Sequence, residues 1–171
     1  PLQIDLRLAN GILSGRLDGV WPRAMIRYRM AGLKAKDRIR AWIAHLVLNA
    51  AAQDPYPRET KLIMTNGVIG YHPVDNAAGC LETLLKLYRM GLSMPLRFFP
   101  ESSLAYVEGA EDGLKKARAK WRDAHEDRLG EGRDAHYQVC FGGEDPFDEE
   151  FAAVAKAALE PLLRHQIQEK R

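Results

Sequence analysis

The first 29 residues of the chain restrict its fold most, because apolar and polar residues alternate there in successive short segments. Residues 3–8 alternate with the period of a β-strand that buries one face. Asn10-Gly11 follows, and this dipeptide favours a tight hairpin because both residues tolerate positive φ. Residues 12–20 predict a second strand and residues 24–29 a third. We therefore expect an antiparallel meander of three strands.

The remaining sequence predicts more helices than strands. Residues 34–53 place apolar side chains three and four positions apart, which is typical of a helix with one buried face. Residues 61–71 predict a second hairpin. The pattern is mainly helical afterwards, and the last helix is expected over residues 147–168, with a kink or a break at Pro161.

Strands that come first and helices that come later indicate an α+β fold. A length of 171 residues suits a single domain. We expect a strand-rich core over residues 1–75 and a mainly helical part over residues 76–171. Because the sequence begins at Pro1 without a methionine, we expect it to be a fragment of a longer chain.

Several classes of protein are not supported by the sequence. It contains no apolar run of roughly 18 residues and no signal peptide, so we expect a cytoplasmic protein without a membrane contact. It lacks the phosphate-binding motif of ATPases. Cys80 and Cys140 form no CxxC pair, and no two histidines have metal-ligand spacing, so we expect no cofactor. His45 is interpreted as a packing residue and Ser102-Ser103 as a helix N-cap.

Charge is unevenly distributed along the chain although its formal net value is only +2. A basic segment between residues 23 and 40 contains one acid, Asp37, and the following cations: Arg23, Arg27, Arg29, Lys34, Lys36, Arg38 and Arg40. A second basic run lies over residues 115–122, and an acidic cluster over residues 144–150. Such segregation favours a positive surface that attracts phosphates, although solvated helix faces give the same pattern.

One group of residues suggests specific chemistry. Gly15-Arg16-Leu17-Asp18 ends the second predicted strand, and Arg27-Tyr28-Arg29 lies on the third, just before the first helix. This order resembles the restriction-endonuclease-like nucleases of the RecB family. In those enzymes the second strand carries a Gly-Arg-Ile-Asp-like motif and the third carries Asp-Tyr-Lys, part of the PD-(D/E)xK signature. The resemblance implies a restriction-endonuclease-like core.

The nuclease chemistry explains why these positions matter. Two carboxylates on adjacent strands hold Mg²⁺ against the scissile phosphate, and a lysine two residues after the second carboxylate orients the attacking water. Asp18 matches the first carboxylate, but Arg27 reverses the charge of the second and Arg29 replaces the lysine. We therefore expect an inactive site in which Arg27 or Arg29 forms a salt bridge with Asp18.

A wider resemblance covers nearly the whole chain. Several segments are similar to the C-terminal domain of the RecC family, in the same order: Gly32–Asp37, Trp42–Leu46, Leu87–Leu92, Phe99–Ser102, Leu114–Arg118 and Gly130–Gly132 with Tyr137-Gln138. Proteins of this family work with RecB and RecD subunits as exodeoxyribonuclease V in double-strand-break repair by homologous recombination. The resemblance implies a nuclease-like domain without a nuclease site that helps to split DNA, guides single strands and contacts partner subunits.

Three functions remain open from the sequence. The first is a module that guides DNA through non-specific phosphate contacts, with Trp21 and Tyr28 available for base stacking and Trp42 in the core. The second is a scaffold that binds RecB-like and RecD-like subunits without touching DNA. The third is a nuclease with a rearranged site, in which Asp18 is joined by Asp5 or Asp37.

Overall fold

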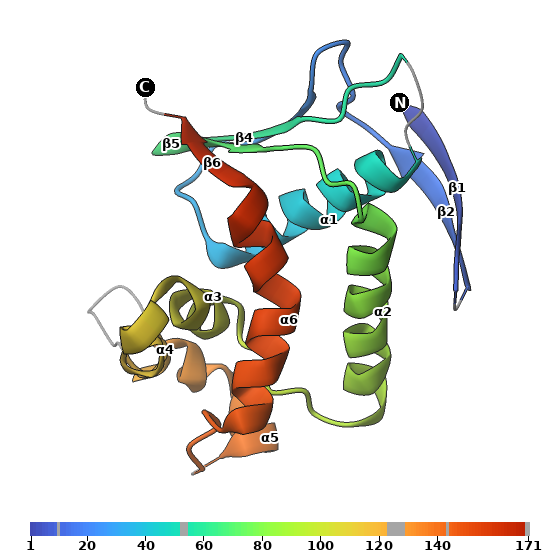
Figure 1. The fold of residues 1–171 in the computed structure, drawn as a ribbon. Coiled ribbons are helices and arrows are strands. Elements are labelled where there is room, and N and C mark those ends of the chain that lie inside the picture. Colours follow the sequence, from blue (N-terminus) through green and yellow to red (C-terminus); the bar gives the residue numbers. More distant parts are fainter. Residues whose placement is uncertain (10, 52–54, 123–128, 143, 170–171) are drawn as a thin grey trace. The chain divides into compact units, whose positions relative to one another are not determined.

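The structure of the chain, a computed structural model, describes residues 1–9, 11–51, 55–122, 129–142 and 144–169. The chain divides into two compact units, which Figure 1 shows coloured along the sequence. The first unit comprises Pro1–Lys86 and Arg164–Arg171, and the second comprises Leu87–Leu163. The boundary lies later than the expected division at residue 75.

Helix α2 (Ala77–Ser93) explains the later boundary, because its first turns belong to the first unit. Ala77 and Leu81 are buried. The carboxylate of Glu82 accepts a hydrogen bond of 2.9 Å from the backbone N–H of Ala9, which lies just after the first strand.

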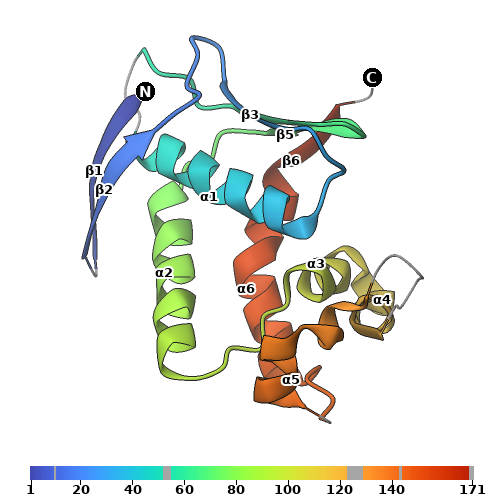
Figure 2. The same ribbon diagram turned by 180° about the vertical axis from the view of Figure 1, so that it is seen from behind.

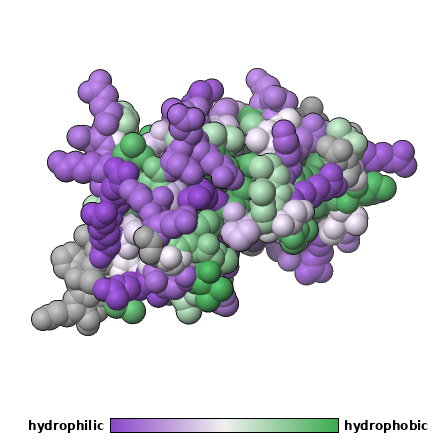
Figure 3. Space-filling view, turned by 90° about the horizontal axis from the view of Figure 1, so that it is seen from below, coloured by the Kyte–Doolittle hydropathy of each residue, from purple (hydrophilic) through white to green (hydrophobic). Residues whose placement is uncertain are grey.

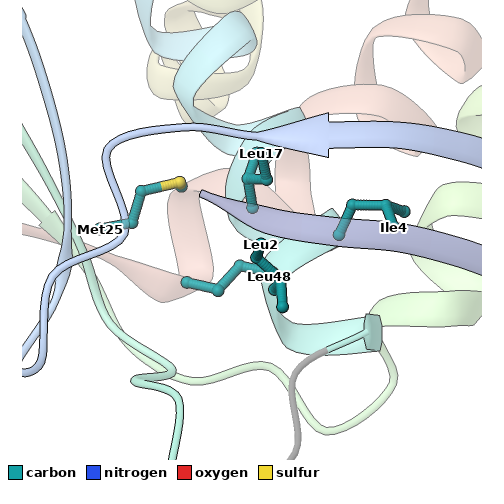
Figure 4. Close-up of a cluster of buried hydrophobic side chains, with 5 residues drawn as sticks. All are labelled: Leu2, Ile4, Leu17, Met25 and Leu48. Atoms are coloured by element: carbon teal, nitrogen blue, oxygen red, sulfur yellow. The ribbon is translucent and has the colours of Figure 1, made fainter.

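Two strands form a separate hairpin at the start of the chain. β1 (Leu2–Leu8) pairs with β2 (Gly11–Leu17) in an antiparallel register from Leu2↔Leu17 to Leu8↔Gly11. Asn10, half of the predicted turn, lies outside the described residues. The alternation predicted from the sequence has its physical cause in a shared core, drawn in Figure 4, which contains Leu2, Ile4, Leu17, Met25 and Leu48.

The main sheet has four strands, in the order β3-β4-β5-β6. β3 (Met25–Arg29) runs parallel to β4 (Thr60–Met64), while β4 and β5 (Gly67–Tyr71) form the predicted hairpin. The expected three-stranded meander is therefore wrong. A parallel pair requires a long crossover, and α1 (Ala35–Ala51) provides it between β3 and β4.

A short contact still connects β3 with the end of the hairpin. Val20 and Met25 form an isolated antiparallel bridge, and the N–H of Ile26 donates to the carbonyl of Gly19 at 2.8 Å. Gly19 has φ +77°, and a Cβ atom there would lie 2.6 Å from the carbonyl oxygen of Ile26. Only glycine fits this close approach without strain.

Helix α1 lies against one face of the sheet, as Figures 1 and 2 show from opposite sides. Its predicted apolar stripe is confirmed in part, because Trp42 and Leu46 are buried but Ile43 is 41% exposed. The ring of Trp42 lies 5.7 Å from that of Tyr71. His45 is also buried, so its interpretation as a packing residue is confirmed. Its ring is in addition fully hydrogen-bonded, since Nδ1 meets the hydroxyl of Thr60 and Nε2 meets the carbonyl of His72.

The last helix ends earlier than predicted. α6 runs over Glu149–His165 and includes Pro161, so the proline does not split it. The next residues form β6 (Gln166–Glu169), an antiparallel neighbour of β5, where a continued helix was expected. The N–H of His72 donates to the carbonyl of His165 at 2.9 Å, which joins the end of α6 to the first unit.

The second unit packs around an aromatic cluster. Its helices include α3 (Pro100–Glu108), α4 (Gly113–Arg122) and α5 (Ala135–Phe141). The ring of Phe99 is central to the cluster, and its aromatic neighbours are Trp121, Tyr137, Phe141, Phe147 and Phe151.

The start of α3 differs from the prediction. Phe99 is the N-cap residue, and Ser102 and Ser103 lie buried in the first turn, so their assignment as N-cap is wrong. The hydroxyl of Ser103 instead accepts from the N–H of Phe99 at 3.1 Å. The carboxylate of Glu131 takes the capping role, accepting from the N–H groups of Glu101 at 3.0 Å and Ser102 at 2.8 Å.

The surface is mixed in character. Figure 3 shows hydrophilic side chains over much of the face seen from below, with hydrophobic areas between them. Among the described residues, no helix combines the length and the apolar character that crossing a membrane requires.

Candidate nucleic-acid interface

Strand β3 brings Arg27 and Arg29 to one side of the sheet. β3 is an edge strand, with β4 as its neighbour in the sheet. Because side chains alternate along a strand, Arg27 and Arg29 share the face of buried Met25, the face on which α1 packs. The register places Leu62 of β4 beside Arg27 and Met64 beside Arg29.

A pocket of about 320 Å³ opens between these strands and the first half of α1. We call it the arginine pocket. Its lining residues are Arg27, Tyr28, Arg29, Asp37, Arg40, Ala41, Leu62 and Met64. Three cations and one anion leave it a formal net charge of +2. Three of the predicted nucleic-acid-binding residues therefore converge on one site.

Arg29 is held by an acid from the helix. Its Nη1 donates to both carboxylate oxygens of Asp37, each at 2.9 Å. The side chain of Asp37 is only 7% exposed and lies in the first turn of α1, where the helix dipole favours an anion. The single acid of the basic segment thus fixes one arginine at the rim of the pocket.

The expected salt bridge between Asp18 and the β3 arginines is wrong. Asp18 pairs with Arg16, whose Nε lies 3.0 Å from its carboxylate, and both side chains are 59% exposed. The two residues lie two positions apart along one short stretch, so a local partner satisfies Asp18 while Asp37 satisfies Arg29.

Arg27 and Arg40 differ from Arg29, because no counter-charge pairs with either of them among the described residues. Within the described part of the chain, neither guanidinium takes part in a hydrogen bond or a salt bridge, and the Nε atom of Arg27 is buried without an acceptor. Arg27 is half-buried and Arg40 is exposed. A partly desolvated cation without a partner is energetically costly, so an anion bound in the pocket would be strongly favoured.

The other predicted nucleic-acid-binding residues lie outside the pocket. Arg23 and Lys36 are exposed and Lys34 is half-buried. Arg38 is only 7% exposed, and its Nε donates to the side chain of Gln166 at 3.0 Å. Arg38 therefore anchors β6 to α1 and does not present its guanidinium with the exposed cations.

The second basic run lies on α4 in the other unit. Lys115, Lys116, Lys120 and Arg122 are exposed, which fits a solvated helix face as well as a binding surface. Arg118 is engaged: it pairs with Asp145 of the acidic cluster at 2.8 Å. Arg122 lines a separate pocket of about 480 Å³, in which Glu144 and Asp145 balance the charges of Arg122 and Arg133.

The described residues give a rearranged nuclease site no donor set. No group of three metal-ligating side chains comes together among the described residues. Asp5 is exposed on β1, and Asp37 is occupied by Arg29. A hard cation such as Mg²⁺ needs several carboxylate oxygens, whereas the arginine pocket offers one carboxylate among three guanidinium groups.

The aromatic residues considered for base stacking differ in exposure as expected. Trp21 is 63% exposed and Tyr28 is 77% exposed, while Trp42 is in the core. Tyr28 alternates with Arg27 and Arg29 along β3 and pairs with Ile63 in the register, and some of its atoms also line the arginine pocket.

Comparison with known proteins decides the family. Residues 1–111 match the family model of the RecC C-terminal domain. The chain belongs to the RecC C-terminal domain family. One relative is the RecBCD enzyme subunit RecC of Escherichia coli (strain K12), which is 31% identical over 155 residues. The match covers 80% of this chain but 14% of that protein, so the chain corresponds to a small part of its relative.

The match to the RecC C-terminal domain family includes the hairpin, β3, α1 and the β4–β5 pair, and with them the whole arginine pocket. Sequence reasoning found the arginines of this pocket but not the anion that organises them. The signal for Asp37 was present, because it lies three residues before Arg40 and four before Ala41, on the same helix face. Leu62 and Met64 were missed because the parallel pairing of β3 with β4 was not predicted.

Proposed function

We propose that this chain is a nuclease-like domain without nuclease activity, which contributes a DNA-guiding surface to a RecC-type subunit in the cytoplasm. The observation that carries the proposal is the arginine pocket. Arg27 in this pocket occupies the position that a metal-binding carboxylate has in the nucleases that the sequence resembles. A cation at that position repels Mg²⁺ and attracts the phosphates that the metal would otherwise bridge.

The arrangement of elements supports a restriction-endonuclease-like origin. Strands β1, β2 and β3 are followed by α1, the order in which the nuclease motifs were placed. Asp18 follows β2 directly, and Arg27 and Arg29 lie on β3. The proposal is thus that the scaffold of the nuclease is kept while the charges of its site are altered.

The partners follow from the relative rather than from the geometry. The Escherichia coli protein is named as a subunit of the RecBCD enzyme. We extend this assembly to the present chain, with RecB-like and RecD-like subunits as protein partners and with double-strand-break repair by recombination as the process. The domain itself carries out no chemistry in this proposal.

The test is a titration of the protein with a forked DNA duplex at about 50 and 200 mM salt, with Mg²⁺ or with EDTA. We expect salt-sensitive binding and no cleavage. The triple variant R27A/K34A/R40A should reduce the slope of log affinity against log salt by about 2 to 3, since each lost phosphate contact removes about 0.9. Arg38 is left intact because it is structural. Mg²⁺-dependent cleavage by the pure protein would refute the proposal.

A scaffold function is the second candidate, and the outer face of the sheet favours it. Tyr28 and Ile63 are neighbours in the register and are 77% and 40% exposed, and Met30 just after β3 is 88% exposed. Exposed apolar residues in one region suit a protein contact. Tight binding of a RecB-like or RecD-like subunit together with no DNA binding at low salt would favour this function over the first.

A further inference from the structure

We propose that the arginine pocket binds one backbone phosphate of single-stranded DNA, with Arg27 and Arg40 as the two groups that clamp it. This inference rests on the proposed function and assigns its DNA contact to a particular site and a particular form of DNA. The ligand chemistry is that of a phosphodiester, and a terminal phosphate offers the same oxygens.

The charges of the pocket define what it accepts. Asp37 neutralises Arg29 through two hydrogen bonds of 2.9 Å, which leaves the charges of Arg27 and Arg40 without a partner among the described residues. Guanidinium groups present their N–H donors in a planar fork that matches the oxygens of a phosphate. Two such groups from different elements, β3 and α1, can approach one phosphate from two sides.

The position of Asp37 also restricts the ligand. Its hydrogen bonds hold Arg29 against α1. Arg27 and Arg40 are therefore the guanidinium groups that remain available to a bound anion. The carboxylate of Asp37, which also lines the pocket, repels a second phosphate there. The site therefore suits a single phosphate group and not the two adjacent phosphates of a nucleoside diphosphate.

The apolar floor favours a DNA strand over a free anion. Ala41, Leu62 and Met64 line the pocket beside the guanidinium groups. They offer no hydrogen bonds, but they pack against the sugar carbons on either side of a phosphate. A free inorganic phosphate, which keeps its hydration shell, gains nothing from these three side chains.

The concave form of the site favours a single strand. A flexible strand can bend one phosphate into a pocket of about 320 Å³. Duplex DNA also exposes its phosphates, but its backbone is held in a regular helix, so placing one phosphate deep in the pocket would require a local distortion that costs free energy. Its contacts with the chain would be spread over the exposed cations outside the pocket, such as Arg23 and Lys36.

The experiment is a fluorescence anisotropy titration of the protein with three labelled probes at about 50 mM salt. The probes are a thymidine 12-mer with a 5′-hydroxyl, the same 12-mer with a 5′-phosphate, and a duplex of equal length. The variants are R27A and R40A, and the matched control is R16A, which removes an arginine of the same unit that is paired with Asp18 outside the pocket. Circular dichroism confirms that each variant is folded, and R27K replaces R27A if that variant is not.

We expect R27A and R40A each to weaken binding of both 12-mers about tenfold, because a charge-assisted hydrogen bond is lost in each. R16A should change the affinity less than twofold, and the duplex should respond to R27A about as weakly as to R16A. Inorganic phosphate at millimolar concentration should compete poorly with the 12-mer. A terminal phosphate as the true ligand would be revealed by a preference of tenfold or more for the 5′-phosphorylated probe, and it would overturn the assignment to an internal phosphodiester.

Two further outcomes separate this inference from the function on which it rests. If the protein binds the 12-mers but R27A and R40A behave like R16A, the assignment to the pocket is wrong and the DNA-guiding function stands. If the protein binds no probe at low salt, both are wrong.

Discussion

The pair formed by Arg29 and Asp37 gives a quantitative test of the arginine pocket, because its two side chains differ sharply in burial. Asp37 is 7% exposed and Arg29 is 43% exposed. The variant R29A leaves a buried carboxylate without its counter-charge, whereas D37A leaves an arginine that water can reach. The two truncations should therefore have unequal effects on the free energy of unfolding.

Removing one partner of a fully buried pair costs about 3–5 kcal/mol, and an exposed pair contributes about 0–1 kcal/mol. R29A lies between these limits, so we expect a loss of about 2 kcal/mol. D37A loses the hydrogen bonds and a favourable charge in the first turn of α1, and we expect about 1 kcal/mol. In the double variant R29A/D37A no unpaired buried charge remains, and the loss should again be about 1 kcal/mol, smaller than for R29A alone.

The assay is urea unfolding followed by circular dichroism for the wild type, both single variants and the double variant. D18A is the control, because the Arg16–Asp18 pair is 59% exposed on both sides and its loss should change stability by less than about 0.5 kcal/mol. A loss in D37A equal to or above that in R29A would refute the reasoning, and so would a double variant whose loss is the sum of the two single losses.

Three further predictions concern single residues. Burial lowers the pKa of His45 from 6.5 to about 4, so the unfolded chain binds a proton more readily than the folded chain does. The stability present above pH 6.5 should therefore fall by about 2 kcal/mol by pH 5. Urea unfolding of the wild type and of H45Q at both pH values measures this loss. G19A places a Cβ atom 2.6 Å from the carbonyl oxygen of Ile26 at φ +77° and should lower the stability by about 1–2 kcal/mol, whereas G32A, whose Cβ would meet its nearest neighbour at 3.9 Å, should be close to neutral in the same assay. E131A removes the carboxylate that caps α3 and should cost about 1–2 kcal/mol, with loss of helical signal at lower urea concentration; an unchanged midpoint would show that the cap is dispensable.

Most local elements could be predicted from the sequence, because each depends on neighbours in the chain. The hairpin of β1 and β2, helix α1 and the hairpin of β4 and β5 follow from periodicity alone. The strand that pairs with β3 could not be predicted in this way. A strand can pair at either of its two edges, and the choice here depends on where α1 returns the chain to the sheet. The final strand β6 was hidden for a similar reason: Gln166–Glu169 has no distinctive pattern and becomes a strand by pairing with β5.

The candidate site shows the same division between local and distant information. Arg27 and Arg29 were recognised from their places in a short motif. Their partners were assigned wrongly, because the prediction considered the strands of the motif and not the helix that packs on them. Asp18 pairs with Arg16, two residues away, and Arg29 pairs with Asp37 on α1. In both cases the charge nearest in the folded chain, and not the one that the resemblance to a nuclease motif implies, determined the pairing.

The positive charge of β3 affects how the arginine pocket could hold a phosphate. In a nuclease of the resembling type, the carboxylates attract a metal ion, and the metal in turn attracts the phosphate. With Arg27 and Arg40 in the pocket, the protein offers the positive charge itself, and no metal is needed to hold the phosphate. Such a site can retain a DNA strand without the activated water that cleaves it. A strand held by exchangeable phosphate contacts can still slide, since each phosphate is chemically equivalent to the next. Arginines in these positions would suit the pocket for guiding DNA, and this is why we favour a guiding role over a purely structural one.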